Sequence, residues 1–183
     1  MNIMKVVITG SPCSGKSTLI AELKMRGFTV VEEIARSVLE KVGAPLTLED
    51  KEKLQIKIAR QQKEIESKTR YSDILFLDRG LIDVIAYCNI LLGYIPQEVL
   101  DITNVKSYNA VFILEKIPFL QDGLRLEKSD KEAENIHNEL ISTYNINGYS
   151  PIFVPIMPLD KRIEFIFSHI KNLKGGNIKN VCI

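Results

Sequence analysis

The sequence predicts an α/β protein in which a five-stranded parallel sheet is covered by helices on both faces. Short apolar runs of strand length alternate along the chain with stretches of helical periodicity. The central run of the first strand and most of the third are apolar on both faces, as expected of strands buried in a parallel sheet. A glycine-rich turn joins the first strand directly to the first helix. Together these observations predict a single three-layer domain.

Five strands are expected where apolar and β-branched residues follow one another without interruption. In chain order they occupy residues 3–9, 28–31, 73–78, 110–114 and 152–155. The third strand ends in Asp78, so that a carboxylate directly follows the apolar run at 74–77. In a parallel sheet, ligands bind outside the carboxyl ends of the strands. The residues that follow each strand are therefore the candidates for function.

Seven helices are expected between and after these strands. They occupy residues 16–26, 33–41, 47–69, 80–92, 96–105, 131–144 and 159–173. Gly27 and Gly93 end the first and fourth, because glycine readily adopts the left-handed conformation that closes a helix. Thr47 and Asp50 have the spacing of a capping box at the start of the long third helix.

Apolar spacing predicts which helix faces turn inward. The 80–92 helix is apolar nearly all round, so we expect it to be buried. The long third helix has an inward face formed by Leu54, Ile58 and Ile65. The last helix is amphipathic, with an inward face formed by Ile163, Ile166, Phe167 and Ile170.

Composition and charge narrow the function classes. The 183 residues carry 24 basic and 23 acidic side chains, a net charge of +1 that argues against a nucleic-acid partner. No apolar run has membrane-spanning length, and because the N-terminus leads directly into the first strand we expect no signal peptide. Three scattered cysteines indicate a reducing compartment, so we expect a cytoplasmic protein. One domain is expected over residues 1–173, followed by a flexible tail at 174–183.

The strongest functional signal is the turn after the first strand. Residues 10–17 have the pattern G-x-x-x-x-G-K-S between a strand and a helix, which is the context of a phosphate-binding loop. Glycines let backbone N–H groups converge on an anion, and the helix N-terminus adds partial positive charge. The sequence thus predicts a P-loop NTPase fold, and its strand pattern resembles that of nucleoside and nucleotide kinases. The nucleotide-binding residues are Gly10, Ser11, Cys13, Ser14, Gly15, Lys16, Ser17 and Thr18.

Within this loop, Lys16 would contact the β- and γ-phosphates, and the Ser17 hydroxyl would bind Mg²⁺. Asp78, at the end of the third strand, stands where such folds place a second acid for Mg²⁺. The alternative is that Asp78 caps the following helix. Arg79 faces the same crevice and is predicted to bind an anionic group of the substrate.

The residues after the second strand are predicted to contact the acceptor. Glu33 would accept a proton or hold the acceptor, and Arg36 would bind a phosphate or carboxylate on it. The alternative is an ordinary surface ion pair between the two, because they are spaced i, i+3 on a helix.

A polar segment at about residues 117–130 is predicted to be a lid over the nucleotide. Arg125 in this segment would neutralise charge on the transferring phosphoryl group. Gly123 would supply the flexibility of the lid. The alternative is a solvated turn, since Asp-Gly at 122–123 is a common turn dipeptide.

Taken together, these motifs resemble a compact kinase-like P-loop group of AAA-domain proteins. The group includes nicotinamide-riboside-kinase domains and animal TRPL-translocation-defect proteins. The resemblance runs from about residue 5 to about residue 170 and depends on the phosphate loop and on residues 32–36, 76–83, 86–87 and 122–125. It implies the following site residues: Lys16 and Ser17 for phosphate and Mg²⁺, Asp78 and Arg79 for the acid–arginine motif, Arg125 for the lid, and Glu33 and Arg36 for the acceptor. In the acceptor segment, Glu32 could equally be the inward residue in place of Glu33.

We therefore expect a Mg²⁺-dependent phosphotransferase that binds ATP and a small nucleoside- or nucleotide-like acceptor. A regulatory ATP- or GTP-binding switch with slow hydrolysis is the main alternative, because members of the group differ in substrate. A kinase of nucleic-acid 5′ ends is a third, which would need a basic groove bearing aromatic side chains. The acceptor, the preferred base and the oligomeric state are left open by the sequence.

Overall fold

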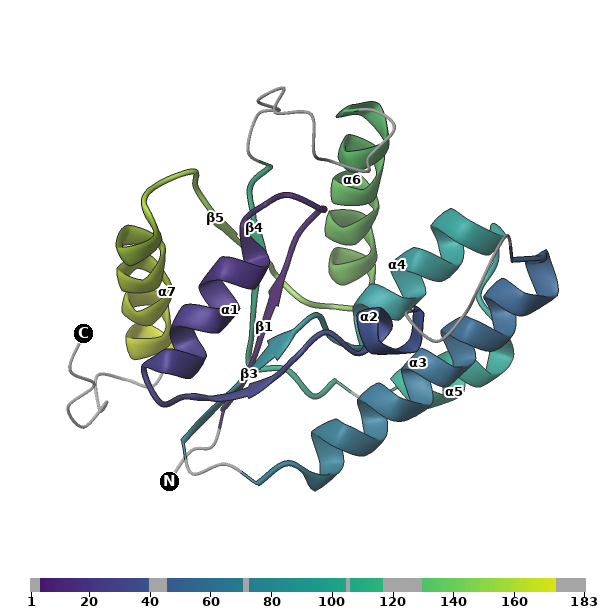
Figure 1. Ribbon diagram of the computed structural model, residues 1–183, viewed down its shortest axis with the longest axis horizontal. Helices are drawn as coiled ribbons and strands as arrows, with labels where there is room; N and C mark the ends of the chain where they lie inside the picture. Colours follow the sequence, from purple (N-terminus) through teal and green to yellow (C-terminus); the bar gives the residue numbers. More distant parts are fainter. Residues whose placement is uncertain (1–3, 40–45, 71–72, 105, 117–129, 174–183) are drawn as a thin grey trace.

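A computed structural model of the chain describes residues 4–39, 46–70, 73–104, 106–116 and 130–173. Its core is a sheet of five parallel strands in the order β2-β3-β1-β4-β5, with helices on both sides (Figure 1). The strands are β1 (Met4–Thr9), β2 (Thr29–Val31), β3 (Ile74–Asp78), β4 (Ala110–Leu114) and β5 (Ile152–Val154). The helices are α1 (Lys16–Met25), α2 (Ile34–Leu39), α3 (Leu48–Lys68), α4 (Leu81–Leu92), α5 (Gln97–Thr103), α6 (Asp130–Ile146) and α7 (Leu159–Leu173). The predicted fold class is confirmed.

The strand β1 lies in the middle of the sheet, between β3 and β4. All residues of β3 and β4 are buried, because helices cover both faces of a parallel sheet. In the register of the sheet, Ile8 of β1 pairs with Asp78 of β3. The loop after β1 and the turn after β3 therefore leave the sheet side by side at the same edge.

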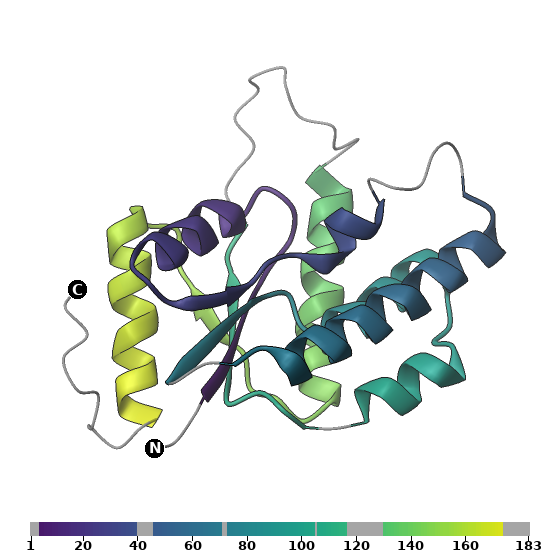
Figure 2. The same ribbon diagram turned by 60° about the horizontal axis from the view of Figure 1, so that its bottom comes forward.

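Two helix layers cover the sheet, and both views show them on opposite sides (Figures 1 and 2). The helices α1 and α7 pack on one face, and we call them the α1–α7 layer. On the other face lie α3, α4 and α6, the α3–α4–α6 layer, with α5 packed against α3 and α4. The helix α2 packs on α3.

The core under the α1–α7 layer is almost wholly apolar. Phe28, Phe76 and Phe167 meet there, with ring centroids 5.0 to 5.9 Å apart. Leucines and isoleucines of the two helices complete it. The predicted inward face of the last helix is confirmed, because Ile163, Ile166, Phe167 and Ile170 are all buried.

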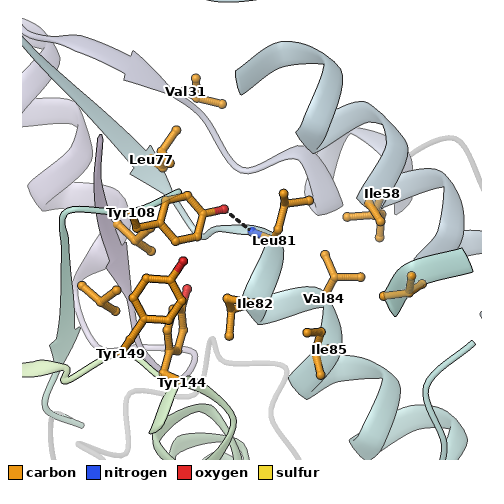
Figure 3. Packing of buried hydrophobic residues seen from close by; sticks show 14 of the residues in the cluster. Val31, Ile58, Leu77, Leu81, Ile82, Val84, Ile85, Tyr108, Tyr144 and Tyr149 are labelled. Carbon is orange, nitrogen blue, oxygen red and sulfur yellow. Dashed lines mark hydrogen bonds between the residues drawn. The ribbon is translucent and has the colours of Figure 1, made fainter. Parts of the chain in front are cut away.

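The core under the α3–α4–α6 layer combines apolar side chains with tyrosines. Tyr108, Tyr144 and Tyr149 gather beside the first turn of α4, and their hydroxyls point into the core (Figure 3). A buried hydroxyl needs hydrogen-bond partners. Polar groups are therefore built into this layer.

The predicted helix ends agree closely with the structure. Thr47 and Asp50 form the capping box of α3, where the Thr47 side chain accepts from the Asp50 N–H at 3.1 Å. Gly93 directly after α4 and Gly27, two residues after the end of α1, adopt left-handed conformations.

One predicted helix face is wrong in part. Leu54 and Ile58 of α3 are buried, but Ile65 is 36% exposed and its neighbour Glu66 is only 4% exposed. The inward face near the end of α3 is polar, since Gln62 and Glu66 are buried there. The α4 helix is buried over its first two turns, as predicted, whereas Ile90 and Leu91 near its end are exposed.

The expected tail at 174–183 lies outside the described residues. The expected lid at 117–130 also lies outside them, except for Asp130, which is the first residue of α6. Among the described helices, none combines the length and the apolar character needed to cross a lipid bilayer.

Candidate active site

The loop between β1 and α1, residues 10–17, curls tightly; we call it the phosphate loop. Its φ angles are positive at Gly10 (149°), Cys13 (62°) and Gly15 (82°). A Cβ atom on Gly10 would lie 2.9 Å from the carbonyl oxygen of Leu114 on β4, so a side chain does not fit there. The helix α1 begins at Lys16, which places a helix N-terminus at the end of the curl.

Polar groups inside the phosphate loop are left unpaired. The hydroxyls of Ser11 and Ser14 are buried and have no hydrogen-bond partner among the described residues. The carbonyl of Ser14 accepts a hydrogen bond from the Arg162 guanidinium of α7 at 3.0 Å. Buried polar atoms are nearly always paired, so the two hydroxyls mark a place where a polar ligand is expected.

Lys16 and Asp78 lie beside this loop, and both are buried, with 7% and 6% exposed. Burial lowers the pKa of Lys16 to about 8, with a contribution from the charge of Arg79. Burial also raises the pKa of Asp78 to about 6, although the charge of Lys16 acts in the opposite direction. The Oδ1 atom of Asp78 has no hydrogen-bond partner among the described residues. This carboxylate therefore has an oxygen available for a cation or a proton.

Arg79 follows in a left-handed backbone conformation with φ of 69°, which is uncommon for a residue other than glycine. Its Nε donates to Glu33 Oε1 at 2.8 Å. Its guanidinium lies 5.1 Å from the ring centre of Tyr87 and 3.7 Å from Asp83 Oδ1. Burial alone would lower the pKa of Arg79, but Tyr87, Glu33 and Asp83 together raise it, so the side chain stays charged. The ion pair joins the ends of β2 and β3.

Asp83 is the second buried carboxylate at this edge, with 2% exposed. Its Oδ2 accepts from the Gly80 N–H at 2.8 Å and from the Tyr144 hydroxyl at 2.6 Å, and its Oδ1 accepts from the Thr9 hydroxyl. Asp83 is the third residue of α4, and its carboxylate caps the helix by accepting from the backbone N–H of Gly80, the N-cap residue. The alternative prediction, that Asp78 caps this helix, is therefore wrong.

A cavity of about 710 Å³ opens beside the phosphate loop, and we call it the loop-side cavity. Its walls come from α1, from α2 and from the end of β3. It brings together four predicted site residues: Ser17, Glu33, Arg36 and Asp78. Arg36 stands at its exposed rim.

A second cavity, of about 370 Å³, lies among α2, α3, α4 and α6, and we call it the inner cavity. Most of its lining is apolar, contributed by side chains such as Leu54, Ile58 and Val84. Its polar lining includes Glu33, Gln55, Gln62, Arg79, Asp83 and Tyr87. An apolar cavity of this size with a few polar groups is typical of a small-molecule site.

A family model described as an AAA domain matches residues 5–162. The chain belongs to this family. The predicted resemblance to AAA-domain proteins is thereby confirmed. The phosphate loop and both cavities are formed by residues within the matched region. No curated protein matches the chain in sequence.

Solved structures place this AAA-domain chain among P-loop kinase folds. The protein NadR in complex with NR superposes with a TM-score of 0.72 at 18% identity, over 98% of this chain and 54% of NadR. This chain thus spans about half the length of NadR. Deoxyadenosine kinase from M. mycoides gives 0.62 at 18% identity, over 92% of this chain and 100% of its own. Thymidylate kinase from Ehrlichia chaffeensis gives 0.66 at 14% identity, over 93% and 100%. At such identities the likeness establishes the fold.

The fold of this AAA-domain protein brings most of the predicted site residues to one edge of the sheet. Glu33 pairs with Arg79, not with Arg36, so the predicted surface pair on α2 does not form. Glu32 turns outward and pairs with Lys24 at 2.5 Å. Arg125 lies outside the described residues. The roles assigned to these residues stay predictions.

Several residues of the site went unrecognised in the sequence. Asp83 stands three positions after Gly80, which is the spacing of a helix-capping acid, and could have been found from it. Tyr87 lies in the 86–87 segment on which the family resemblance depends, although no role was predicted for it. Gln62 carries no such signal, because a polar residue on a helix is equally typical of an exposed face. Arg162, 148 positions from the Ser14 carbonyl that it contacts, has no local signal either.

Proposed function

We propose that the protein is a Mg²⁺-dependent kinase that transfers the γ-phosphoryl group of ATP to a hydroxyl group of a small nucleoside- or nucleotide-like acceptor. The supporting observation is that Glu33 lines both cavities. The space beside the phosphate loop and the enclosed space for a small molecule thus meet at the Glu33–Arg79 ion pair. Phosphoryl transfer depends mainly on this kind of positioning of donor and acceptor.

On the donor side, the phosphate loop would hold the triphosphate. The unpaired hydroxyls of Ser11 and Ser14 and the charge of Lys16 suit an anion there. A nearby phosphate favours the charged form of Lys16, so it would raise the pKa of this side chain from about 8.

Ser17 and Asp78 fit a Mg²⁺ ion. Both line the loop-side cavity, and Asp78 has an oxygen without a hydrogen-bond partner among the described residues. Hydroxyl and carboxylate oxygens are ligands that Mg²⁺ prefers. When bound, Mg²⁺ would offset negative charge on the phosphate oxygens.

On the acceptor side, the inner cavity would hold the apolar body of the acceptor, with its hydroxyl towards Glu33, Asp78 and Arg79. With a pKa of about 6, Asp78 is mostly ionised near neutral pH and suited to take the proton of that hydroxyl. Arg79 is held by Glu33 and would orient the acceptor.

A regulatory nucleotide switch is the competing function. It would use the same phosphate loop but has no need of an enclosed site for a second small molecule. The inner cavity, with buried polar groups beside the loop, therefore favours the kinase.

The test is ATP consumption with Mg²⁺ across a panel of nucleosides, nucleotides and nicotinamide riboside. We expect one acceptor class to stimulate turnover, and Lys16→Ala to reduce it by about 100-fold or more while the fold is retained. Lys53→Ala, a matched change in an exposed lysine on α3, should leave turnover unchanged. Nucleotide binding without stimulation by any acceptor would contradict the kinase and favour the switch.

A further inference from the structure

A buried cluster of charged and polar groups lies beneath the turn that follows β3. Glu66 of α3 is 4% exposed. Its Oε1 accepts from Gln62 Nε2 at 2.9 Å and from the Tyr108 hydroxyl at 2.9 Å. Its Oε2 lies 3.5 Å from Lys5 Nζ of β1. We call Lys5, Gln62, Glu66 and Tyr108 the Glu66 cluster. Lys5, Glu66 and Tyr108 line neither cavity.

The hydrogen-bond directions within the cluster are consistent with one another. Burial raises the pKa of the Tyr108 hydroxyl well above its usual value, and the charge of Glu66 raises it further. The hydroxyl therefore keeps its proton and donates it to Glu66. Its oxygen is left to accept one further hydrogen bond.

Two hydrogen bonds lead from the cluster to the backbone on either side of Gly80. The Leu81 N–H donates to the Tyr108 oxygen at 2.6 Å, the bond drawn in Figure 3. Gln62 Nε2 donates to the Arg79 carbonyl at 3.3 Å. The cluster thus holds the carbonyl of the Arg79–Gly80 peptide bond and the N–H of the Gly80–Leu81 peptide bond.

Tyr108 approaches Gly80 more closely than a side chain at that position would allow. A Cβ atom on this glycine would lie 2.8 Å from the Tyr108 hydroxyl oxygen. The phenol therefore occupies the space that a side chain at position 80 would need. Tyr108 packs directly on the turn in addition to bonding with it.

This turn holds the unfavourable backbone of Arg79. A left-handed conformation in an arginine persists only where the surroundings impose it. That conformation sets the direction of the side chain, which reaches Glu33 Oε1 at 2.8 Å and lines the inner cavity. A relaxed turn would move the guanidinium away from that position.

We propose that the Glu66 cluster is a positioning device for Arg79: through Tyr108 and Gln62 it holds the Arg79–Gly80 turn so that the guanidinium faces the acceptor. Glu66 and Tyr108 are positioning residues, because neither lines the loop-side cavity or the inner cavity. This role rests on the proposed kinase function.

The test compares two buried tyrosines of the same core. Tyr108→Phe removes the acceptor of the Leu81 N–H. Tyr149→Phe is the matched control, since its hydroxyl accepts from the Ser107 N–H at 3.1 Å and bonds to no residue of the turn. We expect Tyr108→Phe to raise the KM for the acceptor about tenfold, the effect of leaving one buried donor unpaired. The affinity for ATP should stay the same in both variants.

A second measurement does not depend on turnover. The Nε–Hε resonance of Arg79, assigned by its loss in Arg79→Lys, reports the hydrogen bond to Glu33. It should shift in Tyr108→Phe and not in Tyr149→Phe. An unshifted resonance, or equal changes in acceptor KM for both variants, would overturn the positioning role.

Glu66→Gln provides the same two measurements if Tyr108→Phe does not fold. It keeps the size of the side chain and removes the charge opposite Lys5, so smaller changes in the same direction are expected. If the wild-type protein shows no acceptor-stimulated turnover, the kinase proposal fails. The Arg79 resonance still decides whether the cluster positions that side chain.

Discussion

The two helix layers that cover the sheet have different cores. Under the α1–α7 layer, aromatic rings and aliphatic side chains meet with few polar atoms between them. Under the α3–α4–α6 layer, two carboxylates, two glutamines and three tyrosines are buried in the same space as the leucines and valines.

A buried polar group adds little net stability to the folded state, and the protein is strongly destabilised when the hydrogen-bond partner of that group is removed. The concentration of such groups on one side of the sheet therefore indicates a purpose other than stability. The polar core lies beneath the turn that carries Arg79 and beside the inner cavity. The apolar layer supplies stability, whereas the polar layer gives the site its geometry. Substitutions that separate stability from activity can test this division.

The largest effect, a loss of folding stability, is expected from a substitution in the core under the α1–α7 layer. Phe167→Ala removes a ring that packs against Phe28 at 5.0 Å and should lower the free energy of unfolding by about 3–5 kcal/mol. Turnover per folded molecule should stay within about twofold of wild type, the scatter of changes far from a site. Denaturant unfolding and steady-state kinetics measure the two quantities. Phe153→Ala, which truncates a 42% exposed ring on β5, is the control. A large loss of turnover in folded Phe167→Ala would break the comparison.

A smaller change in the free energy of unfolding, this time an increase, is expected at Asp78 on the edge of the site. The pKa of Asp78 is raised from 3.8 to about 6, chiefly by burial, so the ionised carboxylate is less favourable in the folded state. At pH 7 this costs on the order of 3 kcal/mol, which Asp78→Asn should recover while turnover is lost. As the pH falls through about 6 towards 3.8, wild-type Asp78 takes up a proton and the difference should disappear.

The measurement is the unfolding free energy of wild type and Asp78→Asn at pH 7 and pH 4.5, without nucleotide. Asp101→Asn, an exposed acid on α5, controls for the loss of one negative charge. A variant that is less stable than wild type at pH 7, or a difference that does not depend on pH, would contradict the assigned pKa.

The smallest effect, a loss of ATP affinity, is expected where α7 of the α1–α7 layer contacts the phosphate loop. Arg162 of α7 donates to the carbonyls of Ser14 and Met157, so it ties the phosphate loop to the segment after β5. Arg162→Met should weaken ATP binding about tenfold, since it leaves the buried Ser14 carbonyl without that donor. The KM for the acceptor should not change. Arg26→Met, an arginine that joins α1 to α7 through Asp160, is the control. Equal ATP affinities in the two variants would show that Arg162 acts only in packing.

Local sequence signals were sufficient for the architecture. Apolar runs indicated the strands, glycines and the Thr47–Asp50 pair indicated the helix ends, and G-x-x-x-x-G-K-S indicated the phosphate loop. These features are encoded within a few neighbouring residues. The carboxyl ends of parallel strands also share one edge of the sheet. For that reason the positions of Glu33, Asp78 and Arg79 directly after predicted strands were enough to expect them close together.

The polar core could not be predicted, because its partners are distant in the sequence. Spacing alone assigned Ile65 to the inward face of α3 and suggested no role for Glu66. The fold buries Glu66 because Tyr108, 42 positions away, supplies a hydrogen bond there. A buried acid and a solvated one look alike on a helix until the partner is known.

The central place of β1 in the sheet has a consequence for the order of folding. β1 pairs with β3 and with β4, so it completes its pairing only after residues up to about 113 have been synthesised. The phosphate loop leaves β1, and Gly10 lies against Leu114 of β4. The phosphate loop is thus encoded early in the chain, whereas its packing partner on β4 is synthesised late. A nascent chain released before β4 would carry the whole phosphate-loop motif without the strand against which Gly10 packs.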